Sequence, residues 1–185
     1  MYQGKRAFDV FFSCAGLLVF LPIWLLCALL MLLLDRGPFV FAQTRVGKNK
    51  QPFTVYKIRT MKQSGEVSEL GRWLRATGID ESLQFISVLI GDMSIVGPRP
   101  ITASDLLKLG WEGPHLSWRW RCKPGITGPA QIFEPLATRR SLARDRLYIR
   151  HASLHSDLCA LMLSFGVNIF GKQVIRSVLK RWSAN

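Results

Sequence analysis

The stretch that organises the rest of the chain covers residues 78–100 and reads G-I-D-E-S-L-Q-F-I-S-V-L-I-G-D-M-S-I-V-G-P-R-P. Its first half has the apolar spacing of a short helix, and Gly91 is expected to end that helix. Asp80 and Glu81 lie where the helix should begin. One interpretation is structural, with Asp80 as the helix cap and Glu81 favoured by the helix dipole. The other is chemical, because a carboxylate pair beside phosphate-binding cations suits phosphate chemistry.

Basic residues around this stretch favour the chemical interpretation. Lys57, Arg59, Arg72 and Arg75 precede it, and Arg99 lies near its end, between Pro98 and Pro100. Side chains alternate along a strand, so Lys57 and Arg59 should project from one face of the strand that carries them. This spacing fits an anion clamp and a solvated edge strand equally well. We expect Arg72 and Arg75 to return toward Asp80.

The overall charge points to a polyanionic partner. The 185 residues include 25 Lys and Arg against 12 Asp and Glu, which gives a formal net charge of +13. Nucleic acid, anionic lipid and nucleotide phosphates all satisfy this charge, which does not choose between them. The length allows one compact domain and an anchoring element. The four cysteines form no disulfide framework and no metal-ligand spacing, as in a chain that faces a reducing compartment.

Residues 10–34 form an apolar run in which Ser13 is the only clearly polar side chain. The run is too long for an ordinary core helix or a cleaved signal peptide, so we expect it to stay in the bilayer. Pro22 cannot donate to the carbonyl of Leu18 and should kink the helix. Basic residues flank both ends. The pattern is therefore compatible with a spanning helix and with one that enters and leaves by the same face.

Two strand-like runs follow the apolar segment. Residues 39–41 and 53–56 flank a polar turn at residues 47–50, which predicts a β-hairpin. Residues 123–129 are so rich in Gly and Pro that we expect little regular structure there.

Two further segments suggest contact with a membrane surface. Residues 111–123 interleave three tryptophans with basic residues, a pattern that fits a membrane–water interface better than stacking on single-stranded nucleic acid. Residues 170–182 have the pattern of a basic amphipathic helix lying on anionic lipid. A helix packed into the core is the alternative for this second segment.

Short motifs in a specific order extend over nearly the whole chain. They are Lys5-Arg6 with Asp9, a proline inside the apolar run, Gly37-Pro38, residues 43–47, residues 52–61, Asp80-Glu81 with Gln84, residues 91–94, residues 96–100, residues 123–128 with Ala130-Gln131, and Asp145 with Tyr148, Ser153 and Asp157. In this order they resemble the bacterial sugar transferase family, the monotopic polyprenyl-phosphate phosphoglycosyl transferases.

The resemblance implies an activity, a place and a fold. The activity is transfer of a sugar 1-phosphate from a UDP-sugar to polyprenyl (undecaprenyl) phosphate, with release of UMP, at the start of membrane glycoconjugate assembly such as exopolysaccharide biosynthesis. The place is the cytoplasmic face of the bacterial inner membrane. The partners are membrane lipids and not nucleic acid, and whether the chain forms a homo-oligomer stays open. The fold is α+β and mostly helical. Residues 1–36 would be a re-entrant membrane helix, and residues 37–185 a catalytic domain with a small β-hairpin and interfacial amphipathic helices.

The resemblance also implies residue roles. Asp80 would be the nucleophile of a ping-pong mechanism through a covalent aspartyl-phosphosugar. Glu81 would handle a proton or contact metal, and Asp80 and Glu81 together would bind Mg²⁺. The substrate phosphates would be held by Lys57, Arg59, Arg75 and Arg99. Pro22 would kink the membrane helix.

The chain also departs from the family pattern. Ser82-Leu83 replaces the usual Leu-Pro after the acidic pair, Leu21 replaces a serine before the membrane proline, and Ile90 replaces a basic residue. Two other readings therefore remain: an inactive family member, and a non-catalytic membrane-anchored basic module that binds anionic lipid or nucleic acid. The sequence does not name the sugar.

Overall fold

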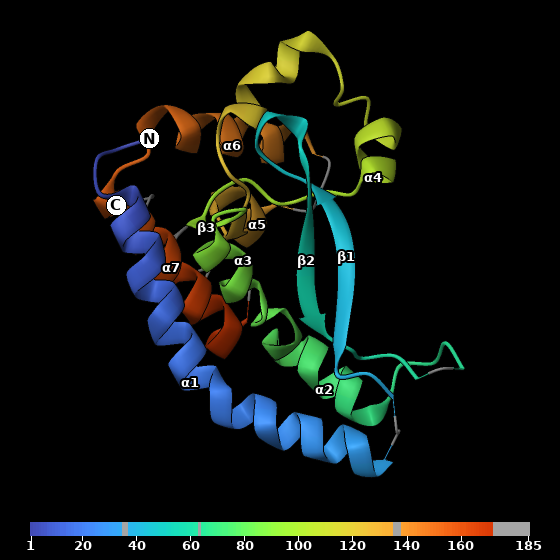
Figure 1. Ribbon diagram of the computed structural model, residues 1–185. Helices are drawn as coiled ribbons and strands as arrows, with labels where there is room; N and C mark the ends of the chain where they lie inside the picture. The colour runs from blue at the N-terminus through green and yellow to red at the C-terminus, as the bar shows by residue number, and fades with distance from the viewer. Residues whose placement is uncertain (35–36, 63, 135–137, 172–185) are drawn as a thin grey trace.

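The computed structural model describes residues 1–34, 37–62, 64–134 and 138–171 (Figure 1). The expected amphipathic helix at residues 170–182 lies almost entirely outside the described residues. In chain order the elements are α1 (Lys5–Leu34), β1 (Val40–Val46), η1 (Lys48–Lys50), β2 (Pro52–Ile58), α2 (Glu69–Thr77), η2 (Ile79–Glu81), α3 (Gln84–Ile90), β3 (Ser94–Val96), α4 (Ala103–Lys108), η3 (Pro114–Arg121), β4 (Gly125–Thr127), α5 (Pro129–Phe133), α6 (Arg139–His151) and α7 (Leu154–Phe170). The predicted class, α+β and mostly helical, is confirmed.

Helix α1 runs along one side of the molecule and bends part-way into two arms (Figure 1). Pro22 lies inside this helix, and the missing hydrogen bond and the ring of a proline account for a bend. Most of the apolar side chains of α1 are exposed, among them Leu18, Leu25 and Leu33. By length and composition α1 is long and apolar enough to cross a membrane.

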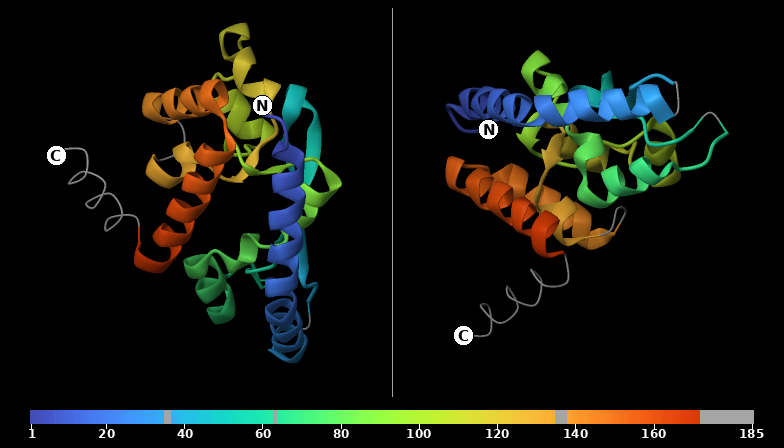
Figure 2. Two further views of the ribbon diagram at one scale, coloured as in Figure 1. Left: turned by 90° about the vertical axis from the view of Figure 1, so that its left-hand side faces the viewer. Right: turned by 90° about the horizontal axis from the view of Figure 1, so that it is seen from below.

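The first arm of α1 is fixed to the domain by buried charges. Lys5 Nζ lies 2.6 Å from Asp157 Oδ2 on α7, and 3.2 Å from Asp9 Oδ1. Asp9 also accepts hydrogen bonds from the Ser94 hydroxyl and the Ile95 N–H of β3. Helices α1 and α7 accordingly approach each other at their N-terminal ends and diverge beyond them (Figure 2). Because buried charges need partners, this network holds the N-terminal end of α1 against α7 and β3.

The predicted β-hairpin is confirmed, with β1 and β2 antiparallel and Val40 opposite Ile58. The expectation of little regular structure at residues 123–129 is wrong for part of that segment, since β4 pairs in parallel with β3. The two backbones approach closely at Gly97 and Gly125, where an added Cβ on Gly125 would lie 2.1 Å from the Gly97 nitrogen. Pairing with a distant strand therefore overrides the local preference for a turn.

The tryptophan-rich segment belongs to the core, so the predicted membrane interface there is wrong. Trp111 and Trp120 are only 4% and 5% exposed. Arg119 lies between them, with its guanidinium carbon 4.9 and 5.0 Å from the two ring centroids, and its Nε donates to Asp145 Oδ2 at 3.1 Å. Arg119, whose charge suggested a membrane–water interface, instead pairs with the buried carboxylate of Asp145. This pairing allows Arg119 to be buried together with the two tryptophan rings.

The organising stretch, residues 78–100, forms two short helical segments, η2 and α3, followed by strand β3. Gly78, with φ of 72°, ends α2, and Gly91, with φ of 107°, ends α3 as predicted. Asp80 and Glu81 lie in η2, whereas α3 begins only at Gln84. The capping interpretation of Asp80 is therefore wrong, because its side chain lies too early in the chain to serve as the cap of α3.

Candidate active site

A pocket of about 640 Å³ opens between the hairpin and the segment formed by α2 and η2. Strand β2 contributes Lys57, the loop after it contributes Arg59, and α2 contributes Arg75. Asp80 and Glu81 of η2 complete the charged part of its wall. The structure thus brings together five of the six side chains proposed for chemistry or phosphate binding.

The two neighbouring carboxylates have different environments. Glu81 Oε1 accepts a 2.5 Å hydrogen bond from Lys57 Nζ, and Gln84 also hydrogen-bonds Glu81. Burial opposes ionisation of Glu81, but Lys57, Arg99 and Gln84 together hold its pKa below the usual value. Burial, and then the charge of Glu81, raise the pKa of Asp80 more than Lys57 and Arg75 lower it. Asp80 is therefore the less compensated carboxylate of the pair.

The cations of α2 differ in what they reach. Arg75 lines the pocket and donates from Nε to Thr60 Oγ1 at 2.8 Å. Arg72 is exposed and pairs with Glu69 at 3.4 Å, so its expected return toward Asp80 is wrong. Side chains on a helix lean toward its N-terminus, and Arg72 lies one turn earlier than Arg75, so it reaches back to the first turn.

Arg59 lines the pocket and also holds backbone. Its Nε donates to the carbonyl of Pro38 and its Nη1 to the carbonyl of Met61, both at 2.7 Å. The guanidinium therefore joins the segment that follows α1 to the loop that follows β2.

Arg99 lines a second, smaller hollow of about 40 Å³, which shares Lys57 and Glu81 with the main pocket. Arg45 lines the same hollow and donates a 2.6 Å hydrogen bond to Gln43 Oε1. Burial is the main cause that lowers the pKa of Arg45. We did not select Arg45 as a site residue from the sequence. Its spacing of two from Gln43 on a predicted strand was the available signal, because it puts both side chains on one face.

A metal at this site would depend on few protein ligands. In the part of the chain that the structure describes, no cluster of three or more His, Cys, Asp or Glu side chains could hold a metal ion. Asp80 and Glu81 nevertheless face one pocket, and Mg²⁺ commonly binds through one or two carboxylates together with substrate phosphates.

Comparison with known proteins identifies the family. The model of the family described as bacterial sugar transferase matches residues 1–171. The chain belongs to the bacterial sugar transferase family. The resemblance inferred from the motifs is thereby confirmed.

Three relatives illustrate the similarity. The "UDP-N-acetylgalactosamine-undecaprenyl-phosphate N-acetylgalactosaminephosphotransferase" of Aeromonas hydrophila is 35% identical over 83% of this chain and 41% of its own length. The "Undecaprenyl-phosphate glucose phosphotransferase" of Komagataeibacter xylinus is 37% identical over 91% of this chain and 36% of its own. The "Exopolysaccharide production protein PSS" of Rhizobium leguminosarum bv. phaseoli is 36% identical over 83% and 89%. The chain thus matches well under half of the first two and most of the third.

Proposed function

We propose that this protein transfers a sugar 1-phosphate from a UDP-sugar to a polyprenyl phosphate, such as undecaprenyl phosphate, and releases UMP. Family membership and the names of the relatives support the reaction class. The observation that carries the proposal is the pairing of Asp80 and Glu81 in a pocket that Lys57 and Arg75 also line. The charge of Asp80 is less compensated than that of Glu81, and Asp80 lies in a pocket with cations that can hold a phosphate. Such a carboxylate is suited to attack phosphorus.

The proposed reaction has two steps. In the first, an Asp80 carboxylate oxygen attacks the phosphorus that bears the sugar, and the bond from this phosphorus to the bridging oxygen breaks. UMP leaves with that oxygen, and the phosphosugar stays on Asp80 as an acyl phosphate. In the second, an oxygen of polyprenyl phosphate attacks the same phosphorus and the bond to Asp80 breaks. The carboxylate is regenerated, and the product is a polyprenyl diphosphosugar.

The cations divide the work of holding phosphates. We assign Lys57 and Arg75 to the phosphoryl group under attack, because both line the pocket beside Asp80. We assign Arg99 to the second phosphate, because its hollow adjoins the pocket through Lys57 and Glu81. We assign Arg59 to phosphate binding at the edge of the pocket, where its guanidinium also donates to the backbone carbonyls of Pro38 and Met61.

We propose Mg²⁺ as the cofactor, held by Asp80 and Glu81 together with substrate phosphates. The donor set fits, because burial and the adjacent Glu81 raise the pKa of Asp80, and a cation would relieve that repulsion. When bound, Mg²⁺ would offset negative charge on the pyrophosphate. Glu81 then serves as a metal ligand or a proton acceptor beside Lys57.

We propose that α1 is re-entrant, with both of its ends at the cytoplasmic face of the bacterial inner membrane. Its two arms contact the same domain. The first arm contacts α7 through Lys5, and the second places Cys27 and Met31 in an apolar cluster with Ile58 and Leu74. A helix that bends and returns in this way would bring the pocket to the lipid surface, where polyprenyl phosphate resides.

A half-reaction tests the function. The protein, with Mg²⁺ and a panel of UDP-sugars but no lipid acceptor, should release about one UMP per molecule for the correct sugar, and mass spectrometry should find a phosphosugar on the peptide containing Asp80. Asp80→Asn should abolish both signals and keep membrane binding. UMP release only when both substrates are present, with an unmodified peptide, would indicate a ternary mechanism. Membrane binding without UMP release under any condition would favour the non-catalytic basic module.

A further inference from the structure

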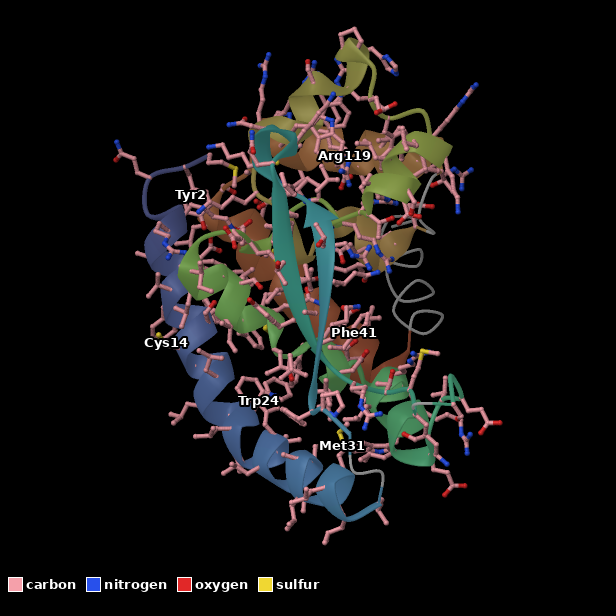
Figure 3. All side chains as sticks on the ribbon, turned by 45° about the vertical axis from the view of Figure 1, so that its right-hand side comes forward. Tyr2, Cys14, Trp24, Met31, Phe41 and Arg119 are labelled. Carbon is pink, nitrogen blue, oxygen red and sulfur yellow. The ribbon has the colours of Figure 1, made fainter. Side chains whose placement is uncertain are left out.

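The pocket has two chemically different parts. Asp80, Glu81 and the cations form the charged part, whereas Phe41, Ile58 and Met61 form an apolar edge. Ile58 is buried, but Phe41 and Met61 are 47% and 43% exposed, so both present apolar surface to solvent at the mouth of the charged site. Figure 3 shows Phe41 on the hairpin, in β1.

The apolar edge lies where the chain returns from the membrane helix. Helix α1 ends at Leu34, and β1 begins at Val40. Arg59 ties this return to the pocket: its backbone N–H donates to the carbonyl of Phe39 at 2.8 Å, its Nε to that of Pro38 and its Nη1 to that of Met61. One arginine therefore fixes both sides of the apolar edge next to the exit of α1.

We propose that Phe41 and Met61 form the site for the first isoprene units of the polyprenyl acceptor, with its phosphate directed to the charged part of the pocket. This inference rests on the proposed function. The acceptor is the one reactant with a long hydrocarbon chain, whereas the sugar, ribose and uracil of the donor are polar. A hydrocarbon chain that leaves the pocket over Phe41 and Met61 would leave beside Pro38, in the segment that follows α1.

The test separates the two halves of the reaction. Phe41→Ser and Met61→Ser are compared with Val40→Ser, which removes an equally exposed apolar side chain from the opposite face of β1. Adduct formation is measured with Mg²⁺ and the UDP-sugar that the panel identifies, without an acceptor. Discharge of the preformed adduct is then measured with undecaprenyl phosphate, geranyl phosphate and methyl phosphate. Phe41→Leu serves as the variant that keeps an apolar side chain at this position.

For Phe41→Ser and Met61→Ser we expect adduct formation within about twofold of the unaltered protein and a KM for undecaprenyl and geranyl phosphate raised about tenfold. Discharge by methyl phosphate should be unchanged, Phe41→Leu should raise the KM for undecaprenyl and geranyl phosphate less than Phe41→Ser does, and Val40→Ser should behave like the unaltered protein. A raised KM for the UDP-sugar with unaltered discharge would place the uracil or sugar on the apolar edge and overturn the inference, as would discharge that is equal in all variants. Failure of the unaltered protein to form an adduct would instead refute the two-step mechanism of the proposed function, and failure to release UMP even with both substrates would refute the function itself.

Discussion

The indole Nε1 of Trp24 donates a 2.8 Å hydrogen bond to Ser82 Oγ, which in turn donates to the carbonyl of Ile79 at 2.6 Å. Trp24 lies on the second arm of α1, and Ser82 directly follows the acidic pair of η2 (Figure 3). Helix α1 therefore holds the turn that carries Asp80 through this hydrogen bond.

Trp24→Phe should slow adduct formation, because it removes the donor that fixes the η2 turn and keeps most of the ring. We expect a roughly fivefold to thirtyfold lower rate with a KM for the UDP-sugar within about twofold, as for the loss of one buried hydrogen bond that positions a nucleophile. Single-turnover kinetics of adduct formation measure both quantities. In the double variant with Ser82→Ala the effects should not add, since both changes remove the same contact. Additive losses, or a raised KM alone, would contradict the positioning role.

The pH dependence should report on Asp80. The attacking group is the carboxylate, so the rate of adduct formation should fall as the pH drops through the pKa of Asp80. Glu81→Gln removes a like charge next to Asp80 and also frees Lys57 from its partner, and both changes favour ionised Asp80. The acid limb of the pH–rate profile should therefore move to lower pH in this variant. An acid limb that stays in place would show that another group controls it.

Arg75→Lys should cost more than charge alone would suggest. Lysine keeps the positive charge but loses the planar fork that contacts a phosphate at two points, so we expect a loss of about 1–3 kcal/mol in transition-state stabilisation, or one to two decades in kcat/KM. Arg72→Lys, one turn earlier on α2 and exposed, is the matched control and should leave kcat/KM within about twofold. Equal effects of the two changes would remove Arg75 from the phosphate site.

Local patterns predicted the parts of this fold that local interactions control. The hairpin at residues 40–58 follows from alternation and a polar turn, and the end of α3 follows from Gly91. The burial of Trp111 and Trp120 was missed, because it depends on Arg119 meeting Asp145, which is 26 positions away. Contacts between distant segments have no local signature, and for the same reason β4 and the contact between Trp24 and Ser82 were not foreseen.

The pocket shows the same division. From the sequence motifs we predicted that Asp80, Glu81, Lys57 and Arg75 belong to the active site. All four side chains line one pocket in the structure. Arg99 belongs to an adjoining hollow, and Arg45 joins it there from β1. Which cation faces which space depends on the packing of β1 and β2 against η2, and residue type and spacing do not encode that packing.

Helix α1 should have both ends on the same side of the membrane. Its first arm forms the buried contact between Lys5 and Asp157, and its second arm packs Met31 beside Ile58, so a helix that spanned the bilayer would have to lose one set of contacts. In a variant without native cysteines, single cysteines at the exposed positions Gln3 and Val40 should both resist an impermeant thiol reagent in intact cells and both react after permeabilisation. Pro22→Ala restores a backbone donor and favours a straight helix, so a fraction of that variant should become labelled at one position. Labelling of the unaltered helix at one end alone would establish a spanning topology and remove the support that α1 gives to a pocket at the lipid surface.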